Sequence, residues 1–344
     1  MSGFRRFVFA LANIVALLLT AWAAAALYFD SAFPALRTFA AVAYLIAMVA
    51  ALWLHRRGTR GLIVAHAGFV LIALWWLTLK PSNDRDWRAD NAKTAYADIN
   101  GDQITIHDVR NCDYRTEEDY TCHWETRSYS LANLRGTDIF VVWWGSPWIA
   151  HTIASFDFGE QGHLAMSIET RDVVGQSYSA IRGFFRQYAL TYIASDERDV
   201  IRLRTNYRKD EEVYMFRTSL QPSLERKIFM EYMNRANSLR VRPEWYNALT
   251  NNCTTNIAVS VVDAQPTRMR LDWRVLLNGK IDEMMYEHGS LATGGLPLPA
   301  LKEQAHINAA AKAADNSPDF SKLIREGRVG FTEDSLHSEK AGSR

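Results

Sequence analysis

The sequence predicts an α+β protein in which three membrane-spanning helices precede an extracytoplasmic domain with an antiparallel sheet. Three observations support this fold class: long apolar runs near the N-terminus, alternating runs in the middle, and helical periodicity around a late cysteine. We place the membrane segment at residues 1–80 and the folded domain at 81–300, followed by a helical and then disordered tail at 301–344.

The N-terminal segment contains apolar runs at residues 7–29, 38–54 and 61–79, each close to the roughly 20 residues that span a bilayer core. Basic residues precede the first run and fill the loop between the second and third, whereas residues 30–37 hold only one. Because positively charged loops stay in the cytoplasm, the N-terminus is expected there and everything after Leu79 outside. For a bacterial chain, this describes a multi-pass inner-membrane protein with a periplasmic main domain.

Strand-like alternation begins after the membrane segment. The expected strands are residues 104–106, 140–144, 149–158, 163–171, 188–192 and 200–203. The third and fourth of these are joined by a short turn with two glycines, which predicts a β-hairpin. In this hairpin His151 shares a face with Ser155, while Ser167, Glu169 and Arg171 share a face of the paired strand.

Two stretches show helical features. Residues 223–237 have an apolar face at helical spacing, with Ser223 as the expected N-cap. Asn252 is a good N-cap residue before the apolar run 257–262, so Cys253 is expected in the first turn of a helix. The free N–H groups and the positive dipole end of that turn favour a thiolate, which makes Cys253 the candidate nucleophile.

The chain has only 3 cysteines. Cys112 and Cys122 lie close together in sequence and are candidates for a disulfide in an oxidising compartment, which would leave Cys253 as the odd thiol. The alternative is that all three are inert buried thiols.

A cysteine nucleophile needs a base, and two histidines on predicted strands precede it in the chain. His151 is the first candidate because apolar residues flank it, and burial would keep it neutral and able to accept the thiol proton. His163 is the alternative. Glu169 is the candidate for orienting the imidazole, as the third member of a triad would; the competing interpretation is an ion pair with Arg171 or Arg186.

Substrate-binding candidates come from the same regions. Asn251 and Asn252 are expected to donate to an oxyanion beside the Cys253 N–H, unless they serve only as capping residues. Ser167 and Arg171 are further candidates on the strand that carries Glu169. No metal or cofactor is expected, because the sequence has no paired CxxC, HExxH or phosphate-cradling glycine motif. With a net charge of +1 and no basic stripe interleaved with aromatics, nucleic acid is not expected as a partner either.

Several stretches together resemble the Lnb-type N-terminal periplasmic domain family over residues 81–262. They are Pro81-Ser82-Asn83-Asp84-Arg85-Asp86-Trp87, His151-Thr152-x-x-Ser155-Phe156, Ser167-Ile168-Glu169-x-Arg171, Arg186-Gln187-Tyr188 and Asn251-Asn252-Cys253-Thr254-Thr255. The resemblance implies a permuted papain-like (NlpC-like) domain, in which the histidine strand comes before the cysteine helix. It also implies Cys253 as nucleophile and His151 as its base.

The resemblance further implies an acyltransferase that moves an acyl chain from a phospholipid, through a thioester on Cys253, to the N-terminal amine of a lipoprotein. Membrane phospholipid and lipoprotein would then be the substrates. Two alternatives stay open at this point: a cysteine peptidase or amidase acting on cell-wall peptides, and a non-enzymatic envelope scaffold in which Cys253 is structural. The acyl donor and acceptor, the third catalytic residue and the oligomeric state are left open by the sequence.

Overall fold

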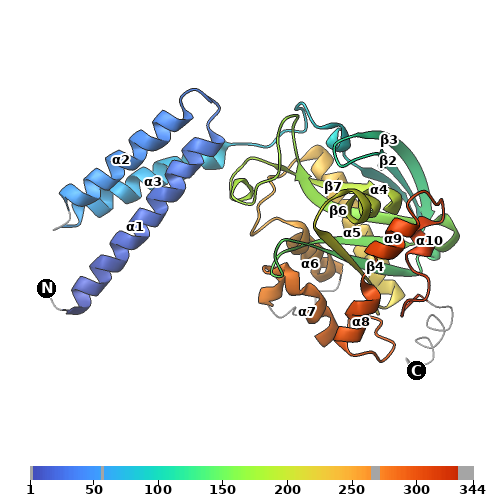
Figure 1. The fold of residues 1–344 in the computed structure, drawn as a ribbon. Helices are drawn as coiled ribbons and strands as arrows, with labels where there is room; N and C mark the ends of the chain where they lie inside the picture. Colours follow the sequence, from blue (N-terminus) through green and yellow to red (C-terminus); the bar gives the residue numbers. More distant parts are fainter. Residues whose placement is uncertain (1–2, 56–57, 265–271, 332–344) are drawn as a thin grey trace. The chain divides into compact units, whose positions relative to one another are not determined.

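The computed structural model describes residues 3–55, 58–264 and 272–331 (Figure 1). Its internal contacts divide the chain into two units, which we describe separately. The first contains the N-terminal helices together with the loop segments Ser177–Ala189 and Glu244–Ala248. The second contains Asn83–Gln176, Leu190–Pro243 and the rest of the chain from Leu249.

Three long helices make up most of the first unit: α1 (Gly3–Asp30), α2 (Arg37–Leu54) and α3 (Arg60–Thr78). Each is long and apolar enough to cross a membrane, which agrees with the three apolar runs of the sequence. Their outward surfaces carry large apolar side chains, for example Phe7, Phe39 and Leu71, which are each at least 65% exposed. Such surface is costly in water and suits contact with lipid chains.

The loop segments of the first unit are fastened to the ends of these helices by polar contacts. Asp30, the last residue of α1, accepts hydrogen bonds from Trp76 Nε1 at 2.7 Å and from Gln187 Nε2 at 2.6 Å. Arg186 donates to the carbonyl oxygen of Leu79. These contacts explain why the Arg186-Gln187 pair belongs to the helical unit although in sequence it lies between segments of the second unit.

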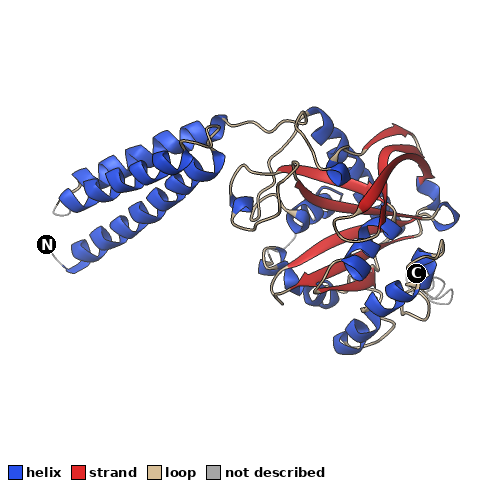
Figure 2. Ribbon diagram, turned by 45° about the horizontal axis from the view of Figure 1, so that its top comes forward, coloured by secondary structure: helices blue, strands red, loops and turns tan. Residues whose placement is uncertain are grey.

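The second unit is built on one sheet, whose strands are drawn in red among the blue helices in Figure 2. Its strands are β1 (Tyr96–Asn100), β2 (Gln103–Tyr114), β3 (Tyr120–Ser130), β4 (Gly136–Trp144), β5 (Ala150–Asp157), β6 (His163–Arg171), β7 (Ala189–Ser195) and β8 (Glu211–Arg217). The order of pairing is β1-β2-β7-β6-β5-β4-β8, with β3 on β2. Apart from the parallel contact of β2 with β7, the recorded strand pairs are antiparallel, so the α+β prediction with an antiparallel sheet is confirmed.

The helices of the second unit lie between and after the strands. They are α4 (Glu197–Arg202), the π-helical segment η5 (Leu203–Tyr207), α5 (Pro222–Val241), α6 (Cys253–Ala264), α7 (Ile281–Glu287), α8 (Leu298–Ala305), α9 (Asn308–Ala313) and α10 (Phe320–Leu323). Short 3₁₀ turns join them; two of these, η6 (Trp273–Val275) and η7 (Asn278–Lys280), follow α6.

Strand β5 is buried on both faces because helices cover both. Ile153 packs in a core cluster with residues of α4, α9 and α10, including Val200 and Phe320. Phe156, which points to the opposite face, makes an edge-on ring contact with Phe229 of α5 at 5.0 Å between centroids. The two side chains differ in parity along the strand, and successive side chains alternate between faces.

Two sequence predictions were wrong in this unit. Residues 200–203 form no strand; they lie in α4 and the start of η5, where Asp196 caps the helix by accepting a hydrogen bond from the Arg198 N–H. Helix α5 begins at Pro222, so Gln221, two residues before the expected Ser223, takes the N-cap position. A proline is well suited to the first helical turn because its missing N–H has no partner there anyway. The polar residues after 331 lie outside the described residues.

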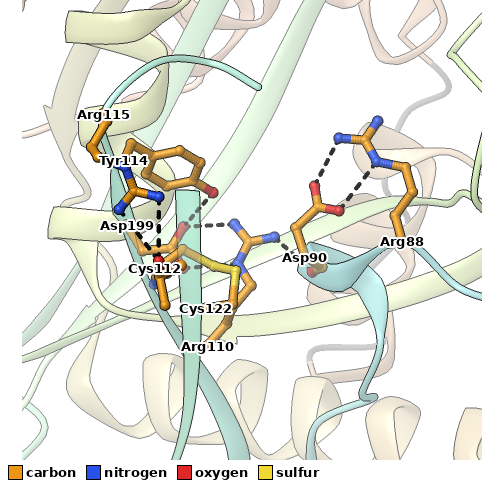
Figure 3. The surroundings of a disulfide bond; sticks show 9 residues. Arg88, Asp90, Arg110, Cys112, Tyr114, Arg115, Cys122 and Asp199 are labelled. Carbon is orange, nitrogen blue, oxygen red and sulfur yellow. Dashed lines mark hydrogen bonds and ion pairs between the residues drawn. A yellow bond between two sulfur atoms is a disulfide. The ribbon is translucent and has the colours of Figure 1, made fainter. Parts of the chain in front are cut away.

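The hairpin β2–β3 carries the two neighbouring cysteines. Cys112 and Cys122 face each other in register and are joined by a disulfide (Figure 3). The Cys112 N–H donates to Asp199 Oδ2 at 2.9 Å, and Arg110 forms a two-pronged hydrogen bond with the same carboxylate. The hairpin is thereby fixed to α4, the helix that carries Asp199.

Candidate active site

Cys253 is the first residue of α6 and is buried. Asn252 caps this helix: its Oδ1 accepts the N–H of Thr255 at 2.9 Å, and its own N–H donates to Thr255 Oγ1 at 2.8 Å. This reciprocal pairing satisfies donors that the first turn leaves without helical partners. The prediction that a helix starts at Cys253 is therefore confirmed, and the sulfur lies at the positive end of the helix dipole.

His151 is the second residue of β5, and its imidazole interacts with the Cys253 thiol and lowers the pKa of that thiol. The backbone N–H of the next residue, Thr152, lowers the pKa of the same thiol. The strand thus brings a base and a backbone donor to the same atom. The structure places His163 elsewhere, 3.8 Å from Asp157 Oδ1 at the far end of the same hairpin.

A relay of hydrogen bonds holds the other side of the imidazole. His151 Nε2 lies 2.8 Å from Ser167 Oγ, and Ser167 Oγ donates to Glu169 Oε1 at 2.6 Å. The direct distance from His151 Nε2 to Glu169 Oε1 is 3.7 Å, so the serine hydroxyl bridges the two. Since the single serine hydrogen goes to the carboxylate, Nε2 of His151 carries a proton and donates it to Ser167, which leaves Nδ1 for the sulfur.

The hairpin register explains why these three side chains meet. Ile153 pairs with Ser167, and the same register carried two residues further sets His151 opposite Glu169. Residues opposite each other or diagonal across a strand pair are within side-chain reach. The turn between β5 and β6 therefore fixes the geometry of the relay.

The charges around Glu169 keep it ionised. Burial alone would raise the pKa of this carboxyl, but the contact with His151 and the charge of Arg204 outweigh it and hold the pKa well below its usual range. Arg204, from η5, donates to Glu169 Oε1 at 3.0 Å and also pairs with Glu211 at 3.4 Å. From the sequence, Arg171 and Arg186 are the expected partners of Glu169; the partner in the structure is Arg204, from a segment in which the sequence predicts no helix.

The Cys253–His151 pair shifts toward thiolate and imidazolium. For Cys253, burial raises the pKa, but the charge and hydrogen bond of His151, the Thr152 N–H and the Thr254 hydroxyl lower it to about 7. For His151, burial and the charge of Arg204 lower the pKa, and the interactions with Cys253 and Glu169 outweigh them, so the net direction is upward. Such an arrangement is one that can make a sulfur nucleophilic near neutral pH.

Asn278 is a site residue that the sequence analysis missed. This buried side chain lies in η7, donates to Thr254 Oγ1 at 2.6 Å and places its Nδ2 3.9 Å from Cys253 Sγ. The only sequence signal was the dipeptide Asn278-Gly279, which is typical of turns in general. Its proximity to Cys253 depends on tertiary structure, 25 residues further along the chain.

The remaining predicted residues hold the surroundings of the site. Asn251 Oδ1 accepts a hydrogen bond from Asn256 at 2.8 Å, and Asn252 is the N-cap described above. Arg171 donates to the carbonyl oxygens of Asn91 and Ala92, each at 2.9 Å, and stacks over Trp87. The roles of these residues toward a substrate remain predictions. Within the described ranges, no cluster of His, Cys, Asp and Glu suited to holding a metal ion is found.

The order of these features along the chain can be compared with known families. Residues 120–279, from β3 through the Asn278-Gly279 pair, match one family model. That family is the Lnb N-terminal periplasmic domain. The resemblance stated from the sequence motifs is confirmed, and the match to this periplasmic domain together with the three apolar helices indicates a membrane protein with a periplasmic domain. Searches of curated proteins and of solved structures gave no match.

Proposed function

We propose that this protein is a membrane-anchored, periplasmic cysteine acyltransferase that forms a thioester on Cys253. The interaction of the His151 imidazole with the Cys253 thiol at the start of α6 carries this proposal. It is the relationship that a sulfur nucleophile and its general base require. The relay through Ser167 to Glu169 adds the third, orienting group.

In the first half-reaction, His151 accepts the thiol proton and the thiolate attacks an ester carbonyl of a phospholipid. A carbon–sulfur bond forms, and the carbon–oxygen bond to glycerol breaks. The leaving alkoxide takes the proton back from His151 and departs as a lysophospholipid hydroxyl. In this proposal the N–H groups of Thr152 and of Cys253, at the start of α6, stabilise the tetrahedral oxyanion.

In the second half-reaction, the N-terminal amine of a lipoprotein attacks the thioester. A carbon–nitrogen bond forms while the carbon–sulfur bond breaks, and the proton released by the amine passes through His151 to the departing sulfur. The products are an N-acylated lipoprotein and the free thiol. The enzyme therefore returns to its starting state without any cofactor being consumed.

The fold and the membrane segment both fit this proposal. The histidine strand β5 precedes the cysteine helix α6 in the chain, which is the order of a permuted papain-like domain. Three helices long enough to span the membrane would keep the domain near its lipid substrates, and a tether of this kind raises their effective concentration at the site. The inner membrane with a cytoplasmic N-terminus is the location we propose.

The thioester is the intermediate to detect. Full-length protein reconstituted with a phospholipid of one defined acyl chain should gain the mass of that acyl group, and neutral hydroxylamine should remove it. Cys253→Ala should show no adduct, and His151→Gln should show it only at a much lower rate. His163→Gln is the matched control because its imidazole lies by Asp157 rather than by the sulfur.

The outcomes separate the candidate functions. An adduct that is transferred to a lipopeptide amine supports the acyltransferase. Cleavage of cell-wall peptides without any acyl adduct would replace it with a cysteine amidase. A protein that folds and inserts, yet forms no adduct and cleaves nothing, would be a scaffold in which Cys253 is structural.

A further inference from the structure

Asn278 connects the strand that carries the base to the helix that carries the nucleophile. Its Oδ1 accepts the N–H of Ala150 at 2.9 Å, and its Nδ2 donates to the carbonyl oxygen of the same residue at 2.6 Å. Ala150 directly precedes His151 in β5. The second hydrogen of Nδ2 goes to Thr254 Oγ1 at 2.6 Å, next to Cys253 in α6.

The hydrogen bonds fix the orientation of the amide and of the threonine hydroxyl. A backbone N–H only donates and a backbone carbonyl only accepts, so the pairing with Ala150 identifies which end of the Asn278 side chain is nitrogen. Thr254 Oγ1 therefore accepts from Asn278. Its own hydrogen is left to point at Cys253 Sγ, which lies 3.7 Å away, a distance compatible with a hydrogen bond to sulfur.

Gly279 allows the segment to approach the strand this closely. A Cβ at Gly279 would overlap backbone atoms of Pro147 and Trp148. The Gly279 N–H donates to the carbonyl oxygen of Trp148 at 3.0 Å, and Trp143 Nε1 donates to the Gly279 carbonyl oxygen at 2.9 Å. Asn278 is thus held by backbone contacts on its own segment and does not depend on Thr254 for its place.

We propose that Asn278 is a positioning residue that holds His151 against Cys253 and directs the Thr254 hydroxyl toward the sulfur. Its Nδ2 lies 3.9 Å from Cys253 Sγ, but both hydrogens of that nitrogen are committed to Ala150 and Thr254, so Asn278 acts through these two residues. The inference rests on the proposed function only in that both need a reactive Cys253. The geometry just described stands independently of which acyl donor or acceptor is used.

The test measures thiol reactivity instead of acyl transfer. The second-order rate of iodoacetamide alkylation at Cys253 of the full-length protein is followed against pH, with Cys112 and Cys122 kept oxidised. In Asn278→Ala we expect the apparent thiol pKa to rise by about one unit, with a roughly fivefold slower reaction at pH 7, because the sulfur loses a directed donor and its alignment with His151. Asn278→Asp should raise the pKa further, because a carboxylate oxygen then faces the sulfur.

Asn237 provides a matched control. Its side-chain amide binds the backbone of Ala97 as that of Asn278 binds Ala150: it accepts from the N–H and donates to the carbonyl oxygen, each at 2.8 Å. Ala97 is in β1, at the opposite end of the strand order from β4 and β8 and separated from β5 by three strands. Asn237→Ala should therefore lower thermal stability as Asn278→Ala does, and leave the alkylation profile of Cys253 unchanged.

Variants of Thr254 distinguish a positioning role of Asn278 from a general effect on stability. Thr254→Val removes the hydroxyl and keeps the shape, so it should reproduce part of the thiol pKa rise, and Thr254→Ser should restore the wild-type value. Wild-type alkylation profiles in both Asn278→Ala and Thr254→Val, with only a lower melting temperature, would overturn the proposal. Failure of acyl transfer in the wild-type protein, with these shifts intact, would count against the proposed function alone.

Discussion

The Ser167 hydroxyl donates a 2.6 Å hydrogen bond to Glu169 Oε1, and this bond decides which nitrogen of His151 carries the proton. Because the serine hydrogen is committed to the carboxylate, Ser167 Oγ accepts from His151 Nε2 at 2.8 Å. In the neutral imidazole this leaves Nδ1 without a proton and able to accept one. Ser167, which the sequence predicts as a substrate-binding residue, therefore lies between the His151 imidazole and the Glu169 carboxylate.

Ser167→Ala should impair the thiol without removing a charged group. The remaining distance of 3.7 Å between His151 Nε2 and Glu169 Oε1 is too long for a hydrogen bond, so the tautomer is no longer fixed. We expect about tenfold slower alkylation of Cys253 at pH 7, in line with the net value of one buried hydrogen bond. Ser155→Ala, on β5 and paired with Glu197, is the control and should alkylate at the wild-type rate. Equal rates in wild type and Ser167→Ala would show that the relay has no influence on the sulfur.

The pH dependence of alkylation reports the Cys253–His151 pair. The pKa of Cys253 is lowered to about 7 from an ordinary value of 9.0, so the wild-type rate should rise through pH 7 and level off well below pH 9. In His151→Gln the charge that lowers this pKa is lost while burial, which raises it, remains. The rising limb should then move above pH 9. His163→Gln should show the wild-type pH profile of alkylation. If the wild-type alkylation rate rose only near pH 9, the Cys253–His151 ion pair would be contradicted.

The site could be predicted where local sequence determines geometry. A polar capping residue before an apolar run gave the helix that starts at Cys253, and strict alternation on both sides of a glycine turn gave the hairpin of His151, Ser167 and Glu169. In a hairpin the register follows from the turn, so residues on one face come together predictably.

The parts that were missed depend on contacts between distant segments. Residues 200–203 form a short apolar run, which periodicity alone cannot assign, and the charged neighbours Glu197 and Asp199 gave no sign that they would be buried. Asn278 lies in a turn-like dipeptide. The side chain of Asn278 hydrogen-bonds to Ala150 and Thr254, which are 128 and 24 residues away in the sequence. Arg204 is a neighbour of Glu169 because η5 packs against the sheet; the two residues are 35 apart in the sequence.

Arg325 should be essential for stability although it lies beyond the segment that matches the family. Its guanidinium donates to Asp138 and to Glu197, both at 2.6 Å, and both carboxylates are fully buried. Arg325→Met leaves the buried Glu197 without its guanidinium partner and Asp138 with Arg217 alone, and breaking a buried ion pair typically costs about 3–5 kcal/mol of unfolding free energy. Chemical denaturation in detergent measures this loss. Arg115→Met, which removes an exposed partner of Asp119, should change the midpoint little.

The stability lost in Arg325→Met should depend on pH, in a direction that follows from the pKa of Glu197. Burial alone would raise the pKa of Glu197, but Arg325 outweighs it and lowers this pKa to about 2, below the ordinary 4.5. In the wild type this contribution to stability is full above pH 4.5 and is lost only as pH falls through about 2. In Arg325→Met burial dominates and the folded-state pKa lies above 4.5. The deficit relative to wild type should therefore be largest at pH 7 and shrink toward pH 5; a constant deficit would contradict this account.

The orientation in the membrane can be tested by labelling single cysteines in a Cys253→Ala background. Gly58 lies in the exposed loop between α2 and α3, and Lys209 is an exposed residue before β8. Positively charged loops are retained in the cytoplasm, so a membrane-impermeant maleimide added to spheroplasts should label Lys209→Cys and spare Gly58→Cys. After lysis both should react. Labelling of Gly58→Cys in intact spheroplasts would reverse the proposed topology.

The disulfide predicts a specific thiol count and a stability change on reduction. Denatured, unreduced protein should contain one free thiol, that of Cys253, and three after reduction. Cross-linking residues only 10 apart in sequence restricts the unfolded chain modestly, so reduction should cost about 2–3 kcal/mol by the loop-entropy model. The loss should be matched by Cys112→Ser/Cys122→Ser, in which reductant has no further effect on the unfolding midpoint.

Because Asp199 ties this hairpin to α4 through the Cys112 N–H and Arg110, we expect the reduced protein to stay folded at 25 °C and to retain the alkylation profile of Cys253. Three free thiols before reduction would show that the bridge does not form.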